Sequence, residues 1–223
     1  MKDSLLAQAL TKFGAGLLLV AALLFLPAGT WGFWQAWLLI GILFVPMFLA
    51  GLILLHRNPA LLARRLRAKE QEGEQKTVIA LSGLMFLAAF VLAGLNFRFR
   101  WFLLPAWVTW AAALVFLLAY ALYAEVLREN VWLSRTIEVQ AEQTVVDTGL
   151  YGIVRHPMYA VTLLLFLSMP LVLGSLFSFA VMLIYPFLIV KRIRNEEAVL
   201  ERELKGYAEY KRRVKYRLLP GIW

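Results

Sequence analysis

Two short polar clusters in the last third of the chain contain the residue types that could do chemistry. The first, residues 149–159, has the sequence GLYGIVRHPMY and places a cation, an imidazole and a phenol close together, as Arg155, His156 and Tyr159. Pro157 disfavours helix at His156, and irregular backbone at membrane depth has to line a cavity or be buried in protein. The residues equally allow a structural role, in which Arg155 extends to the interface, His156 caps a helix and Tyr159 is an interfacial aromatic residue.

The second cluster, residues 191–197, has the sequence KRIRNEE. At helical spacing Glu197 falls within an apolar stripe, and Glu196 borders the same stripe, which consists of Ile193, Leu200, Leu204 and Tyr207. A carboxylate on a buried stripe is costly unless it meets a cation or hydrogen-bond donors. Glu197 therefore needs a partner, which is either a ligand or, in a structural interpretation, Arg155 or Arg194.

The elements that position these clusters are membrane-spanning helices. The chain is 62% hydrophobic and 17% charged, and its apolar residues form long blocks rather than the short runs of a water-soluble core. Four blocks have the length of about 20 residues that a transmembrane helix needs, at residues 5–27, 31–55, 77–96 and 101–124. The first is expected to be a retained span rather than a cleaved signal peptide. The fold class is therefore predicted to be all-α, a polytopic membrane helix bundle.

A fifth apolar block, residues 158–190, would be about 50 Å long as one helix, too long for a single crossing. Pro170, Gly174 and Ser175 mark the expected turn, which gives a hairpin of two short helices and six passes in all. Because such a hairpin returns to the side from which it entered, it brings the two polar clusters to the same membrane face. They are expected to line one pocket, open to water for a charged cofactor and to lipid for an apolar acceptor.

The distribution of charge predicts the orientation and the partners. With the N-terminus inside, all of the 23 Lys and Arg residues except Arg98 and Arg100 fall in cytoplasmic segments, as basic residues usually do. Both termini are therefore predicted to be cytoplasmic. The net charge of +9 suits an anionic lipid surface, and it does not indicate nucleic acid, because the basic residues lie between apolar blocks. The absence of cysteine excludes disulfides, thiolate metal sites and a cysteine nucleophile.

The connecting segments give three smaller predictions. Asn58 followed by Pro59 is typical of a helix start. The basic run after it is expected to be a solvated face against lipid head groups, and it comprises Arg64, Arg65, Arg67 and Lys69. Residues 125–147 are polar and are expected to lie at the interface. We therefore divide one integrated membrane domain into an N-terminal bundle, residues 1–125, and a C-terminal catalytic region, residues 126–223.

At these residues the sequence resembles the isoprenylcysteine carboxyl methyltransferase and phospholipid methyltransferase group. The resemblance is clearest over residues 130–220, with a weaker echo at residues 58–66. Its ordered motifs are Gly149-Leu150-Tyr151, Arg155-His156-Pro157-Met158-Tyr159, Glu196-Glu197, Gly206-Tyr207-Ala208-Glu209-Tyr210 and Leu219-Pro220. Leu150 departs from the proline that is usual in this family, which affects the stiffness of the turn more than the chemistry.

The resemblance implies S-adenosylmethionine as cofactor, with no Rossmann domain and no metal. It assigns the cofactor wall to Tyr151, His156, Pro157 and Tyr159, with Tyr159 able to face the sulfonium by cation–π contact. Glu197, supported by Glu196, would receive the cofactor's ammonium or ribose hydroxyls. Arg155 and Arg194 would bind a carboxylate of the acceptor or cofactor, and Arg155 and Glu197 are the catalytic candidates.

The acceptor implied by the resemblance is lipophilic, most simply an isoprenylcysteine-type carboxylate, which is already a nucleophile and needs no general base. Membrane lipids are the other expected partner, and no obligate protein partner is indicated. One alternative is a nicotinamide-dependent enzyme like the sterol reductases, which share Arg-His-Pro-x-Tyr but typically have Asn where this chain has Met158. Another is a non-enzymatic lipid-binding or transport protein, which would carry polar residues at mid-membrane. The first four blocks have very few.

Overall fold

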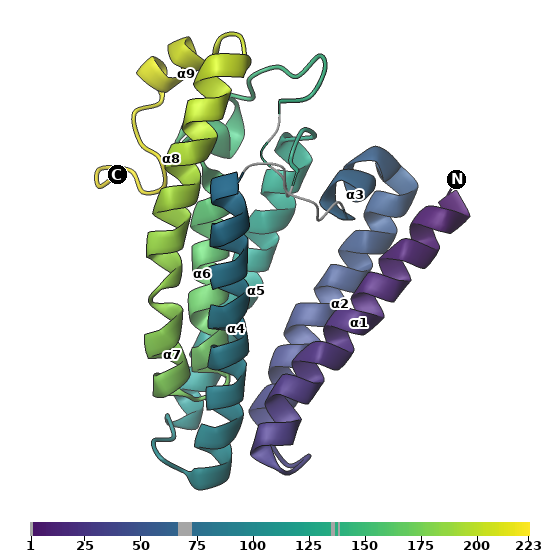
Figure 1. Cartoon of the computed structure of the whole chain (residues 1–223), viewed down its shortest axis with the longest axis vertical. Helices are drawn as coiled ribbons and strands as arrows, with labels where there is room; N and C mark the ends of the chain where they lie inside the picture. Colours follow the sequence, from purple (N-terminus) through teal and green to yellow (C-terminus); the bar gives the residue numbers. More distant parts are fainter. Residues whose placement is uncertain (1, 67–72, 135–136, 138) are drawn as a thin grey trace.

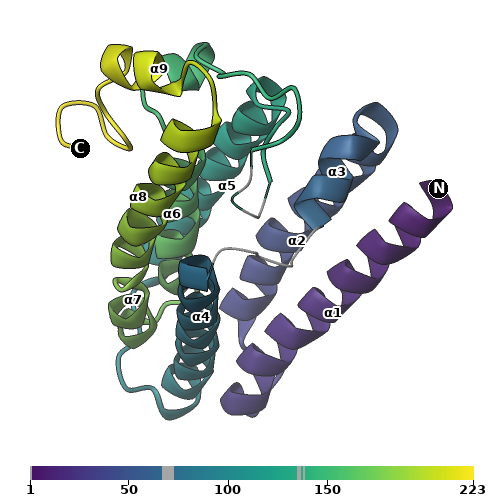
Figure 2. The same ribbon diagram turned by 45° about the horizontal axis from the view of Figure 1, so that its top comes forward.

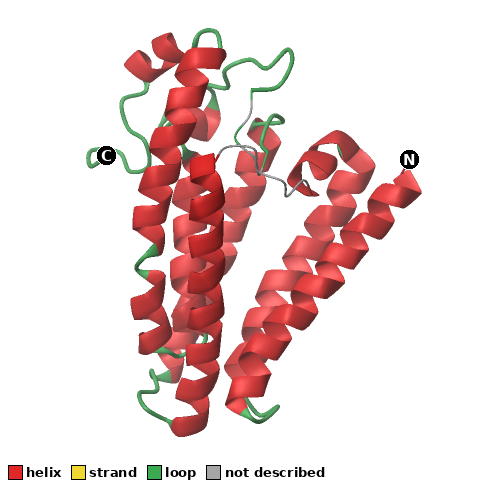
Figure 3. Ribbon diagram, viewed as in Figure 1, coloured by secondary structure: helices red, strands yellow, loops and turns green. Residues whose placement is uncertain are grey.

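A computed structural model describes residues 2–66, 73–134, 137 and 139–223 of the chain, and every regular element among them is helical (Figure 3). The all-α prediction is therefore confirmed. The elements are α1 (Lys2–Ala28), α2 (Trp34–Arg57), α3 (Pro59–Leu66), α4 (Gly73–Phe99), α5 (Ala106–Glu129), a 3₁₀ turn η1 (Gly149–Gly152), α6 (Pro157–Val172), α7 (Leu176–Met182), α8 (Tyr185–Glu203) and α9 (Tyr207–Arg213).

Helix length and surface composition support an integral membrane protein. Five helical stretches are long and apolar enough to cross a membrane, namely Ser4–Ala28, Trp34–Arg57, Lys76–Phe99, Ala106–Glu129 and Leu176–Glu203, with α6 as a shorter apolar helix. Large apolar side chains such as Leu26 and Trp107 are more than two-thirds exposed on the outer surface. In water such exposure would be unfavourable, whereas hydrocarbon covers it without cost.

The helices form two groups that meet at one end (Figure 1). Helices α4 to α8 pack side by side, while α1 and α2 run as a pair that inclines away from them toward the end carrying α3 and α9. The 45° view shows the same separation (Figure 2). At the closed end α1 crosses α4 at Gly94, where a Cβ atom would lie 2.6 Å from the carbonyl oxygen of Leu24. Glycine is therefore required for this close approach.

The predicted hairpin is confirmed, but its return limb is longer than expected. The chain turns at Gly174, which has a φ of +68°, and the Ser175 hydroxyl then caps α7 by accepting from the Ser178 amide at 3.2 Å. Pro170 lies inside α6 rather than in the turn. The return limb is not a short helix, because α8 continues through residues 191–203, where the stripe that begins at Ile193 still has buried partners.

The hairpin returns the chain to the end where α3, α9 and both termini lie (Figure 1). There, the predicted start of α3 is confirmed, because the Leu61 amide donates to the Asn58 side-chain oxygen at 3.1 Å. Described residues between α5 and η1 also pack at this end, where Val131 and Ser134 accept hydrogen bonds from α3.

The two arginines of the expected basic face that the structure describes are half-buried and bind protein groups, so they are only partly open to solvent. Arg64 donates to the carbonyl oxygen of Val131 at 2.7 Å, and Arg65 donates to the Tyr123 hydroxyl. The loop after α5 comes close enough to α3 to capture these side chains, which a sequence pattern cannot show. Arg67 and Lys69 lie outside the described residues.

Candidate functional site

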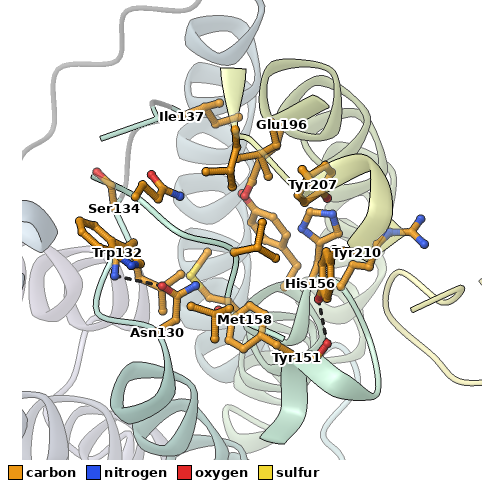
Figure 4. A pocket seen from close by; sticks show the side chains of 18 of the residues that line it. Asn130, Trp132, Ser134, Ile137, Tyr151, His156, Met158, Glu196, Tyr207 and Tyr210 are labelled. Atoms are coloured by element: carbon orange, nitrogen blue, oxygen red, sulfur yellow. Dashed lines mark hydrogen bonds between the residues drawn. The ribbon is translucent and has the colours of Figure 1, made fainter. Parts of the chain in front are cut away.

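A pocket lies at the polar end of the bundle, between the start of α6, the C-terminal half of α8 and α9. Residues that follow α5, among them Asn130, Trp132 and Ser134, lie along its other side (Figure 4). Its empty volume is about 830 Å³, a figure that includes open space at its mouth. Both polar clusters contribute to it, as the hairpin predicts. We call it the α6–α8 pocket.

The segment before α6 is held in place by the C-terminal tail. The backbone amides of Arg155 and His156 donate to the carbonyl oxygens of Tyr216 and Arg217, both at 2.9 Å. His156 is non-helical, with φ −126° and ψ 58°, and Pro157 is the first residue of α6. The irregular backbone expected around Pro157 thus has its partners. His156 occupies the N-cap position of α6, as the structural alternative expects, but its ring makes no capping hydrogen bond.

Glu197 is buried and shared by three donors. It is 3% exposed, and it accepts from Arg155 Nε at 2.7 Å and from Arg217 Nε at 2.9 Å. His156 Nε2 lies 3.3 Å from the same carboxylate. The structural role considered for Glu197, an ion pair with Arg155, is therefore present, and it joins the middle of α8 to the segment before α6 and to the tail.

The Arg155 side chain does not extend to the interface, because it is 6% exposed. Besides Glu197, its guanidinium binds the carbonyl oxygens of Val214 at 2.7 Å and Lys215 at 2.8 Å. Arg155 also lines the α6–α8 pocket. Arg155 therefore both forms part of the pocket wall and holds the C-terminal tail in position.

Among the described residues, Glu196 is the carboxylate that lines the α6–α8 pocket. It accepts a hydrogen bond of 2.5 Å from the Tyr159 hydroxyl, which in turn accepts from Arg192 Nε at 2.9 Å. Arg192 and Glu196 are four residues apart and so lie on the same face of α8. Glu197, the next residue, points toward the buried ion cluster instead. The two acids therefore have different surroundings, and Glu196 is the one accessible to a ligand.

Tyrosines supply the other polar groups of the wall. The Tyr207 ring is 3% exposed, and its buried hydroxyl has no hydrogen-bond partner in the described part of the chain. The Tyr210 hydroxyl donates to the carbonyl oxygen of Tyr151 at 2.8 Å. Burial raises the pKa of Tyr207 and, against a smaller opposing effect from Asn130, that of Tyr151, so both hydroxyls stay neutral donors. An unpaired buried hydroxyl on a pocket wall is suited to bind a ligand.

The structure brings most of the predicted site residues together, but Glu197 lies in the buried ion cluster rather than on the pocket wall, and Arg194 lies elsewhere. Tyr151, His156 and Tyr159 line the pocket with Arg155 and Glu196, while Pro157 starts α6 beside it. Arg194 instead lines a separate, shallow hollow with Lys191 and Asn195. Two residues along a helix rotate the side chain to nearly the opposite face, so Arg194 and Arg192 cannot both face the α6–α8 pocket.

Several lining residues were not predicted as site residues. Arg192 could have been found from its four-residue spacing to Glu196, whereas Tyr207 was recognised in the apolar stripe and in the motif of residues 206–210 but was not assigned to the site. Asn130 and Trp132 come from the loop after α5, where no motif singles them out. Figure 4 shows them across the pocket from Tyr207 and His156.

Comparisons with known proteins agree with this location. Residues 106–206 match the family model described as phospholipid methyltransferase, a region that runs from the start of α5 to the end of α8. The chain is also similar to Delta(14)-sterol reductase TM7SF2 of Mus musculus, with 32% identity over 91 residues, which cover 40% of this chain and 22% of that protein. This family supports a membrane methyltransferase. Residues 106–206, which include most of the residues that line the α6–α8 pocket, therefore match a phospholipid methyltransferase family model.

Proposed function

We propose that this protein transfers a methyl group from S-adenosylmethionine to a lipophilic acceptor at the cytoplasmic membrane surface. The observation that carries the proposal is the α6–α8 pocket, which is lined by Glu196 together with Tyr207, whose buried hydroxyl has no hydrogen-bond partner among the described residues. The pocket lies largely within the region that matches a methyltransferase family. It is also at the end of the bundle where polar loops adjoin the apolar helices, so a water-soluble donor and a membrane-embedded acceptor could both reach it.

The residues present fit the chemistry of this cofactor. Glu196 would receive the cofactor's ammonium, because it is the pocket's accessible carboxylate. The rings of His156 and Tyr159, whose centroids are 5.8 Å apart, would lie beside the sulfonium. Tyr207 offers a hydroxyl for a ribose or ring nitrogen, and Trp132 offers an aromatic face for the adenine. When bound, the cofactor supplies an activated methyl group.

The chain's own residues then need to align the reactants and exclude water. The ion cluster around Glu197 holds the start of α6 against α8 and the tail, which makes Glu197 a positioning residue. His156 Nε2 lies 3.3 Å from the Glu197 carboxylate, a contact that fixes the orientation of the ring. The simplest acceptor for this site is one that needs no base, such as the carboxylate of an isoprenylcysteine-type substrate.

A second candidate is a nicotinamide-dependent reductase, favoured by the similarity to the mouse sterol reductase. The chain spans 22% of that protein's length, so the shared segment could serve a different reaction. Met158 lines the α6–α8 pocket at the position where Asn is typical of the reductases. A thioether cannot donate a hydrogen bond to a nicotinamide amide, which favours methyl transfer.

The test is binding of labelled S-adenosylmethionine to the detergent-purified chain. Glu196→Gln removes the accessible carboxylate and is expected to weaken binding about tenfold or more, because it removes a charge-assisted hydrogen bond. Glu203→Gln is the matched control, since Glu203 lies on the same helix but pairs with Arg202 at the exposed surface. It should bind like the wild type.

A reduced nicotinamide cofactor is added as a competitor in the same assay. Saturable binding that resists this competitor and is weakened by Glu196→Gln supports the proposal. Absence of binding by a folded wild-type chain, or displacement by the nicotinamide, would overturn it and favour the reductase.

A further inference from the structure

Two arginines on α3 carry positive charge beside the α6–α8 pocket, and neither has an anionic partner among the residues that the structure describes. Within the described part of the chain, neither Arg64 nor Arg65 lies within salt-bridge distance of a carboxylate. Both side chains are half-buried. Other half-buried or buried arginines of this protein, such as Arg155 and Arg217, are paired with Glu197.

Arg65 contacts the wall of the pocket with neutral groups only. Its Nη1 lies 3.4 Å from the carbonyl oxygen of Ser134 and 3.8 Å from the Met158 sulfur, and both residues line the pocket. Its Nη2 donates to the Tyr123 hydroxyl, and its Cζ lies 5.6 Å from the centroid of that ring. These contacts fix the guanidinium in place without neutralising it.

Arg64 lies next to it and is also incompletely satisfied. Its Nη2 donates to the Val131 carbonyl oxygen at 2.7 Å, whereas its buried Nε has no hydrogen-bond partner in the described residues. Half-burying a guanidinium removes part of its hydration, and only an anion restores most of that energy. The planar fork of arginine matches a carboxylate or a phosphate.

The position of α3 specifies which anion would come there. The helix begins at the end of membrane helix α2, and its apolar residues Leu61 and Leu62 are buried against the bundle. Its arginines therefore lie where apolar helices give way to the polar loops, which is the level of a lipid-anchored anionic group. A water-soluble anion would not require a binding site at the level of the lipid head groups.

We propose that Arg65, assisted by Arg64, binds the anionic group of the lipophilic acceptor and so orients the acceptor toward the α6–α8 pocket. This inference rests on the proposed function and names its substrate class as an anionic lipophile, carrying either a carboxylate or a phosphate. If the carboxylate itself is methylated, the product ester has no charge and loses this contact, which would favour its release.

The experiment compares lipid binding and cofactor binding on the full chain in detergent. Binding of oleate, dioleoyl phosphatidate and methyl oleate is measured by native mass spectrometry, and binding of labelled S-adenosylmethionine is measured in parallel. Arg65→Gln removes the positive charge. Arg65→Lys keeps the charge but lacks the planar guanidinium that can bind an anion through two N–H groups. Arg57→Gln is the control, because Arg57 is an exposed basic residue at the end of α2.

Arg65→Gln is expected to weaken binding of one anionic lipid about tenfold, with Arg65→Lys intermediate, while binding of methyl oleate and of the cofactor is unchanged. The lipid that is affected, oleate or phosphatidate, identifies the acidic group as carboxylate or phosphate. An equal loss in Arg57→Gln would show a general surface-charge effect and overturn the inference. So would unchanged lipid binding in Arg65→Gln, or loss of cofactor binding in that variant. A wild-type chain that binds no cofactor would instead count against the proposed function.

Discussion

Arg155 and Glu197 form a buried ion pair at 2.7 Å that joins the segment before α6 to the middle of α8. Their side chains are both 4% exposed, so neither charge is compensated by water if the other is removed. Glu197 also holds Arg217 of the tail at 2.9 Å. The pair therefore ties together three segments that are far apart in the sequence.

Replacing Glu197 by Gln is expected to destabilise the fold by about 3 kcal/mol, because the substitution leaves the Arg155 charge buried and unpaired. The measurement is the free energy of unfolding in a mixed-detergent titration followed by helicity. Glu203→Gln on the same helix should cost less than about 1 kcal/mol, since its ion pair is exposed. A Glu197→Gln protein as stable as the wild type but unable to bind S-adenosylmethionine would show that Glu197 is a cofactor ligand rather than a positioning residue.

Tyr207→Phe is expected to change stability and binding in opposite directions. It removes a buried hydroxyl that has no described partner, which should stabilise the fold by up to about 1 kcal/mol. The same change should weaken cofactor binding about fivefold, since one hydrogen bond is lost. Tyr210→Phe is the comparison, because the Tyr210 hydroxyl donates to the Tyr151 carbonyl oxygen at 2.8 Å. Loss of this hydrogen bond should destabilise the fold by about 1–3 kcal/mol. Equal effects of the two variants on stability would contradict this account.

Alkaline pH should unfold the pocket before it ionises the buried tyrosines. Burial raises the pKa of Tyr151, Tyr207 and Tyr210. A folded pKa above the unfolded value means that these neutral hydroxyls contribute stability fully below about pH 10, and that this contribution is lost as the pH rises further. Tyrosinate absorbance should therefore show a late, steep phase that coincides with the loss of helicity. Tyr207→Phe should reduce the amplitude of that phase, and a gradual rise without unfolding would contradict the prediction.

Asn58→Ala should loosen α3 without affecting the pocket on α8. The Asn58 side chain accepts from the Leu61 amide at 3.1 Å, and loss of such a cap costs about 1 kcal/mol. Hydrogen exchange of the α3 amides should accelerate about fivefold, whereas the amides of α8 should be unchanged. Asn58→Asp keeps an accepting oxygen and should restore the protection. If α8 also exchanges faster, α3 is part of a larger cooperative unit.

Much of this protein could be predicted from its sequence because a bilayer constrains the chain strongly. Apolar blocks of sufficient length must be helices, and a block too long for one crossing must turn, which it does at Gly174. The turn then requires the Arg155 and Glu196 clusters to return to one end, so their meeting was also predictable.

The tertiary structure alone decided which polar groups pair with one another. Glu196 and Glu197 are neighbours in the sequence. Only the packing of α8 against α6 and the tail directs the Glu197 side chain toward the ion cluster and the Glu196 side chain toward the pocket. Arg194 faces elsewhere because of its helical phase, and Arg65 reaches Ser134 because a loop without any motif folds over α3. Periodicity and hydropathy specify which face of a helix is apolar, whereas contacts between distant polar side chains depend on loop paths that no local pattern encodes.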